Sequence, residues 1–136
     1  MDIFCTHEKT FPIAYLVGSK KRPYVITEDV TYKLSNGKLF TVPKGFRLDG
    51  TSVPTVLRSL MPRVNDKIIG STLHDYMYMH DHRRLELGDR KARKFADKEM
   101  LYFWDKYDND RKKENKIMYF LVRRFGGLIF KKWNTK

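Results

Sequence analysis

The chain has 136 residues, enough for a hydrophobic core of its own, and we expect residues 1–136 to form a single domain. A hydrophobic content of 41% excludes an intrinsically disordered protein, and a single cysteine, Cys5, excludes an internal disulfide. The formal net charge of +12 favours anionic partners such as nucleic acid.

The first residues lack a basic segment followed by a long apolar run, so no signal peptide is expected. No window approaches the roughly 20 apolar residues of a membrane span. We therefore expect a soluble, cytoplasmic protein without a transmembrane segment.

The first third of the chain is predicted to form antiparallel β-structure. Residues 14–17 and 24–26 are short runs of β-prone side chains. Residues 30–35 and 38–42 largely alternate apolar and polar side chains around Asn36-Gly37, a pair typical of a type I′ hairpin turn. We therefore expect a small N-terminal antiparallel sheet built on this hairpin.

The segment after the hairpin is predicted to be a turn that leads to a short helix. Thr51 or Ser52 would be the N-cap, and the helix would end at Met61-Pro62. Asp49, just before this start, either belongs to the cap or contributes to a functional site.

Three longer helices are predicted in the second half. The first runs from about residue 65 to 80, the second from 89 to 107, and the third from about 111 to Gly126-Gly127. With the short helix, this gives an α+β fold: a small N-terminal antiparallel β-sheet followed by three or four packed helices. The first helix is predicted to have a core-facing stripe of Ile69, Leu73, Tyr76, Met77 and His80. The second carries Ala92, Phe95, Ala96, Glu99 and Phe103 on one side, and the third carries Ile117, Met118, Leu121, Val122 and Phe125 at helical spacing.

Residues 70–82 concentrate three histidines and two aspartates, which are common general bases and metal ligands. His74 lies beside the apolar stripe of its helix, where a side chain is half-buried, and Asp75 lies about 100° further round. Two interpretations stay open for His74: a structural histidine bonded to a neighbouring helix, or a general base or metal ligand. His80 and His82 are expected at the exposed helix end.

Asp97 lies in the middle of the second long helix. If this helix is antiparallel to the first, its carboxylate would approach His74 and orient the imidazole. The alternative is a surface ion pair with Arg93, one turn earlier.

The C-terminal region is strongly basic. Residues 111–136 hold nine lysines and arginines and one acid, Glu114. Such a region favours nucleic acid, an anionic membrane surface or an acidic protein, whereas an ordinary solvated helix face is the alternative. Trp133, beside Lys131 and Lys132, is a candidate membrane or partner contact.

Several motifs occur in order along residues 23–133. They are Val42-Pro43-x-Gly45-Phe46-x-x-Asp49-x-x-Ser52-Val53-Pro54, Leu73-His74-Asp75-x-x-Tyr78, Arg93-Lys94-x-Ala96-Asp97, Met118-Tyr119, Val122-Arg123-x-Phe125-Gly126 and Trp133. Together they resemble a family found mainly in tailed phages, domain of unknown function 1353. This resemblance implies a viral origin and expression in the cytoplasm of a bacterial host, with packaging in the virion as a further expectation. It implies no established activity.

His74-Asp75-x-x-Tyr78 with Asp97 on the next helix is also similar to the active-site helices of secreted phospholipases A2. This similarity implies that His74 is the base, that Asp75 binds calcium and that Asp97 orients His74. The disulfides and glycine-rich calcium loop of that family are missing, and Asp49 is the candidate second metal ligand.

Two functions therefore compete. One is a non-catalytic phage protein, either a virion component or a host-interaction factor, that binds nucleic acid or other phage proteins through its basic C-terminal region. The other is a metal-dependent hydrolase of a lipid or phosphate ester, with His74 and Asp97 as catalytic residues and calcium at Asp75 and Asp49.

Overall fold

The computed structural model describes residues 5–7, 9–19, 22–48, 67–80 and 87–133. Some predictions lie outside these residues: the role of Asp49, the short helix that ends at Met61-Pro62, and the position of His82. The fold class is confirmed, because small antiparallel sheets in the N-terminal half are followed by three α-helices in the described residues.

The β-structure consists of two small antiparallel sheets. One has the strand order β1 (Ile13–Tyr15), β2 (Tyr24–Ile26) and β5 (Arg47–Leu48), and the other pairs β3 (Val30–Lys33) with β4 (Leu39–Val42). The structure has two sheets where one was predicted, and β5, which was expected to be part of a turn, pairs with β2.

The predicted hairpin around Asn36-Gly37 is confirmed, but the type of turn is not. Gly37 has a φ of 85°, whereas the only non-glycine residue with positive φ in the described part of the chain is Arg22. The amide of Gly37 donates to the carbonyl of Leu34. This is the pattern of a type I turn followed by a left-handed glycine, and not the predicted type I′ turn.

The helices are α1 (Ile68–Met79), α3 (Asp89–Tyr107) and α4 (Lys112–Trp133), with a single 3₁₀ turn, η2 (Asn109–Arg111), before α4. The predicted stop at Gly126-Gly127 is wrong, because α4 continues to Trp133. A stop would need a left-handed glycine after the last turn, and neither residue is among the glycines with positive φ. Two helical glycines cost about 1 kcal/mol each, which a long helix tolerates.

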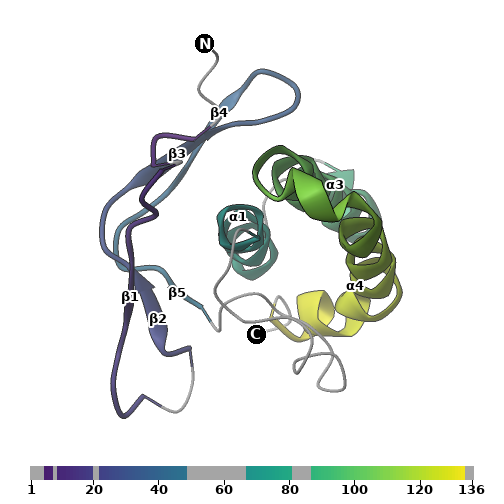
Figure 1. The fold of residues 1–136 in the computed structure, drawn as a ribbon. Coiled ribbons are helices and arrows are strands. Elements are labelled where there is room, and N and C mark those ends of the chain that lie inside the picture. Colours follow the sequence, from purple (N-terminus) through teal and green to yellow (C-terminus); the bar gives the residue numbers. More distant parts are fainter. Residues whose placement is uncertain (1–4, 8, 20–21, 49–66, 81–86, 134–136) are drawn as a thin grey trace.

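Helix α1 is the centre of the fold. Figure 1 shows the two sheets on one side of α1 and the pair α3 and α4 on the other. Ten of the twelve residues of α1 are buried, because the helix is covered on both sides. Of its predicted stripe, Ile69, Leu73 and Met77 are buried, whereas His80 is exposed.

The sheet side of α1 is fixed by a buried tyrosine. Tyr32 on β3 is fully buried, and its hydroxyl donates to the carbonyl of Ile69 at 2.7 Å. Cys5 is also buried, as expected for a small apolar residue. Its backbone pairs with that of Tyr32 in an isolated antiparallel β-bridge. The hairpin is further anchored to α3 by Ser35, whose hydroxyl donates to the Glu99 carboxylate at 2.6 Å.

The other side of α1 approaches α3 closely at Gly70. A Cβ atom there would lie 2.8 Å from the carbonyl oxygen of Met100 and 2.8 Å from the Trp104 ring. The indole nitrogen of Trp104 donates to the carbonyl of Lys67 at 3.0 Å and to the hydroxyl of Ser71 at 3.1 Å. Gly70 therefore sets the distance between the two helices that carry the candidate site.

Helix α4 packs on α3 with one face and leaves the other exposed. Asn115 and Met118 are buried against α3, but Ile117, which shares the helical spacing of the apolar residues, is 60% exposed. Among the described residues no helix is long and apolar enough to cross a membrane.

Candidate functional site

The predicted approach of Asp97 to His74 is what the antiparallel helices produce. His74 on α1 and Asp97 on α3 meet through Nε2 and Oδ1, 2.7 Å apart. His74 is only 5% exposed and Asp97 is fully buried. The predicted half-burial of His74 is wrong, because α1 is covered from both sides.

Two further side chains hold the Asp97 carboxylate. Tyr78, one helical turn after His74, donates its hydroxyl to the same oxygen, Oδ1. Arg123 on α4 donates to Oδ2 at 2.7 Å. Asp97 is thus the junction of three helices, and its two oxygens are both engaged by donors.

The alternative prediction for Asp97, an ion pair with Arg93, is partly confirmed. Nη1 of Arg93 lies 3.7 Å from Oδ2 of Asp97, which is an ion pair one turn apart on α3. The pair is not on the surface, however, because Asp97 is fully buried. Arg93 also donates to the carbonyl of Arg123 at 2.9 Å, so it links α3 to α4.

The charges around Asp97 shift the protonation of the whole cluster. Burial by itself raises the pKa of Asp97, but hydrogen bonds from His74, Tyr78 and Arg123 outweigh it and lower that pKa, so the carboxylate is ionised. Burial and the neighbouring Asp97 raise the pKa of the Tyr78 hydroxyl, which stays protonated and donates.

His74 lies between two carboxylates. Burial lowers its pKa, but the hydrogen bonds and charges of Asp75 and Asp97 outweigh burial and raise the pKa to about 9. At neutral pH, the imidazolium form is therefore the major one in the described structure. The neutral imidazole, which accepts a proton, becomes the major form only above about pH 9.

Asp75 faces the second ring nitrogen of His74. Its Oδ1 lies 3.4 Å from Nδ1, and the residue is buried. A carboxylate oxygen is a donor that calcium prefers, but calcium takes six to eight oxygens. The described residues contain no group of three or more His, Cys, Asp and Glu side chains that could hold a metal ion. The predicted partner Asp49 lies outside them, so the described donors alone do not complete a calcium site.

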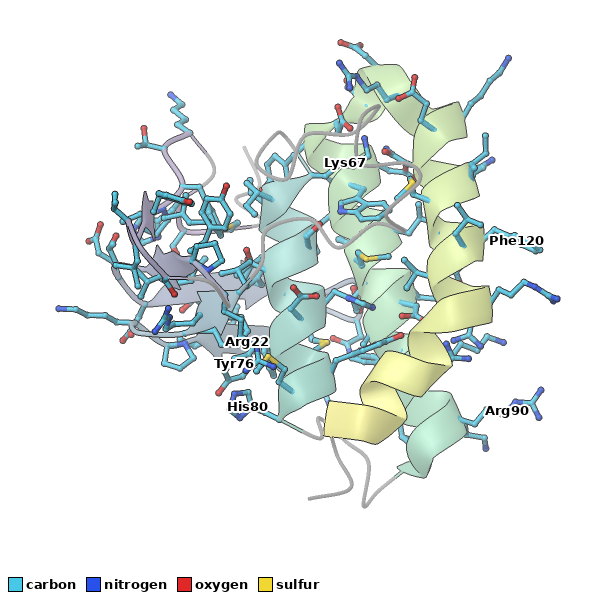
Figure 2. The ribbon with its side chains drawn as sticks, turned by 90° about the horizontal axis from the view of Figure 1, so that it is seen from below. Arg22, Lys67, Tyr76, His80, Arg90 and Phe120 are labelled. Atoms are coloured by element: carbon cyan, nitrogen blue, oxygen red, sulfur yellow. The ribbon has the colours of Figure 1, made fainter. Side chains whose placement is uncertain are left out.

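His80, the C-cap residue of α1, has no part in this cluster. His80 is exposed, and its ring stacks on Tyr76 with centroids 4.3 Å apart. Figure 2 shows both side chains at the end of α1, on the side of the sheets. The expectation of an exposed His80 at the helix end is confirmed.

Arg123 and Tyr78 complete the Asp97 cluster, and the sequence alone predicted no role for either residue. Both occur in the motifs that carry the family resemblance, Tyr78 in the motif with His74 and Arg123 in the motif with Phe125. Periodicity could have paired Tyr78 with His74 at i+4, but Arg123 enters through the packing of α4 on α3, which spacing does not reveal.

The family comparison matches residues 24–122 to the model described as Protein of unknown function (DUF1353). The chain belongs to this family. The matched region of the DUF1353 chain includes His74, Asp75 and Asp97, whereas Arg123 follows directly after it. No curated protein and no solved structure matches the chain.

Proposed function

We propose that this DUF1353 protein is a small hydrolase, encoded by a tailed phage, that acts on a lipid or phosphate ester in the cytoplasm of a bacterial host. The observation that carries the proposal is the 2.7 Å contact between His74 Nε2 and a carboxylate, Asp97, that Tyr78 and Arg123 also hold in place. A fixed carboxylate at one ring nitrogen sets the tautomer and orientation of a catalytic histidine.

The roles of the residues follow from this geometry. In neutral His74, which is the minor form at neutral pH, the Nε2–H group donates to Asp97, so the lone pair is on Nδ1. Nδ1 takes a proton from water while the water oxygen bonds to the ester carbon or phosphorus. The ionised Asp97 stabilises the imidazolium that results. The proton then passes from Nδ1 to the leaving alkoxide oxygen as the ester bond breaks, and His74 returns to its neutral form.

We propose that Asp75 and Asp49 would be ligands of a calcium ion. When bound, such an ion would act as a Lewis acid that polarises the ester. The described donors do not complete the coordination of such an ion.

The test is hydrolysis of p-nitrophenyl esters, phosphate esters and phospholipid vesicles by the wild type and two matched variants. His74→Gln removes the base, whereas His80→Gln changes the same residue type at the C-cap of the same helix, outside the cluster. We expect hydrolysis by the wild type and by His80→Gln, and a loss of at least about a hundredfold in His74→Gln, the usual size of a general-base contribution. Equal rates in all three proteins would contradict the proposal.

A second function is favoured by the saturated hydrogen bonds and the burial of the same cluster. Each oxygen of Asp97 is engaged, and His74 is almost fully buried, as in a purely structural junction. In that case the protein is a non-catalytic virion component or host-interaction factor that binds nucleic acid or other phage proteins through its basic C-terminal region. A salt-dependent mobility shift of DNA that His74→Gln leaves unchanged, together with no hydrolysis by the wild type, would favour this function.

A further inference from the structure

The outer face of α4 carries two exposed apolar side chains among cations. Ile117 is 60% exposed and Phe120 is 65% exposed. Figure 2 shows Phe120 pointing away from the other helices, on the side of the molecule opposite the sheets. Isolated exposed apolar residues are ordinary on a protein surface, but these two lie one turn apart and adjoin each other.

The cations occupy the same face of the helix. At 100° per residue, Lys113, Ile117, Phe120 and Arg124 follow steps of four, three and four and form one stripe, and Lys116 adjoins it. All five residues are exposed. The buried residues Asn115 and Met118 lie on the opposite face, against α3. We call these five residues the α4 stripe; it holds three positive charges and no negative one.

We propose that the α4 stripe docks the protein on the surface of an anionic phospholipid membrane. In this arrangement Phe120 and Ile117 enter the boundary between headgroups and acyl chains, while the lysines and the arginine contact lipid phosphates. The helix would lie in the plane of the interface, which agrees with the absence of a membrane-spanning helix among the described residues.

Charge and apolar surface favour an anionic membrane over the alternatives. A second copy of the chain would bring three cations against three cations, which repel each other. Nucleic acid would attract the cations, but a duplex stacks its bases on one another and offers little apolar surface for Ile117. An anionic lipid surface satisfies both halves of the stripe. Docking does not depend on the chemistry of His74, so it stands or falls separately from the proposed hydrolase.

The test is co-sedimentation with vesicles of phosphatidylcholine alone and of phosphatidylcholine with about a third phosphatidylglycerol. We expect the wild type and His74→Gln to bind the anionic vesicles, with binding that weakens as salt is added. The double variant Ile117→Ser/Phe120→Ser should bind at least about tenfold more weakly. Lys113→Gln/Lys116→Gln should bind about 25-fold more weakly, at about fivefold for each charge removed.

Leu39→Ser is the control, because Leu39 on β4 is 74% exposed but lies outside α4. It should bind like the wild type. Circular dichroism checks that each variant keeps its helices. The proposal is overturned if the wild type does not bind anionic vesicles, or if Leu39→Ser weakens binding as much as the double serine variant. It is equally overturned if the stripe variants impair only binding to a DNA duplex, or only self-association in sedimentation.

Discussion

At the scale of single residues, the molecule depends on Asp97, a fully buried carboxylate that is kept ionised. A buried charge is tolerated only when it is paired and hydrogen-bonded, and Asp97 has donors from α1, α3 and α4. The same contacts that fix His74 therefore also join three helices. Changing Asp97 should affect stability as well as chemistry.

The stability effect gives the first prediction. Asp97→Asn removes the counter-ion of Arg123 and one of the two carboxylates beside protonated His74. We expect a loss of about 3–5 kcal/mol in the free energy of unfolding, measured by urea denaturation. Asp110→Asn on η2, which is exposed, should change it by less than about 0.5 kcal/mol. A loss below about 1 kcal/mol for Asp97→Asn would mean that the cluster does not join the helices.

The second prediction concerns pH. The pKa of His74 is raised from 6.5 to about 9 on folding, so its contribution to stability is fully present below pH 6.5 and is lost as the pH rises through 9. A shift of this size corresponds to about 3 kcal/mol. We expect the difference in unfolding free energy between the wild type and His74→Gln to shrink by about that amount from pH 6 to pH 10. A constant or growing difference would contradict the raised pKa.

How far the sequence predicts this site depends on the range of each contact. The pairing of His74 with Asp97 follows from two helical stretches and the short connection between them. The burial of His74 does not, because α1 is covered by β3 and β4 on one side and by α3 on the other. Arg123 joins through tertiary packing, and Asp49 lies in a part of the chain for which the structure makes no statement.

At the scale of elements, the sheets and helices follow local patterns, and the misses come from tertiary competition. The β-prone residues of β1–β4 and the stripes of α1 and α3 predicted their elements. Strand β5 has only two residues and exists because β2 offers it a partner. Helix α4 passes through Gly126-Gly127, where the local signal predicted a stop, and exposes Ile117 although the spacing suits the core.

Gly70 gives a prediction at this scale. In an ordinary helix, Gly→Ala stabilises by about 1 kcal/mol. In α1, the added methyl would meet the Met100 carbonyl and the Trp104 ring at 2.8 Å and push α3 away. We expect Gly70→Ala to destabilise the fold by about 1–3 kcal/mol in thermal or urea unfolding. A stabilised variant would show that the two helices are not in such close contact.

At the scale of the whole molecule, the net charge of +12 is carried largely by outer helix faces. Exposed cations of α3 and α4 include Lys91, Lys94, Lys98, Lys113, Lys116 and Arg124. The acidic groups around His74 are instead buried at the centre. A cation that reaches Asp75 would therefore have to be drawn by local carboxylates, against the overall charge of the protein.

Calcium binding tests this balance. We expect a dissociation constant of about 10⁻⁴–10⁻³ M by calorimetry, at the weak end for calcium sites, because Asp75 and Asp49 would supply the only predicted carboxylates. Asp75→Asn should abolish the binding heat, and Asp110→Asn should leave it unchanged. Binding that survives in Asp75→Asn, or no binding by the wild type, would remove calcium from the proposed function without affecting the role of His74.

The central claim is that Asp97 holds Nε2–H of His74 and makes Nδ1 the basic nitrogen. Nitrogen NMR of the histidine rings across pH, assigned with His74→Gln, tests this claim most directly. We predict that His74 titrates near pH 9 and that the neutral form carries its proton on Nε2. A neutral form protonated on Nδ1, or an ordinary titration near pH 6.5, would contradict the account.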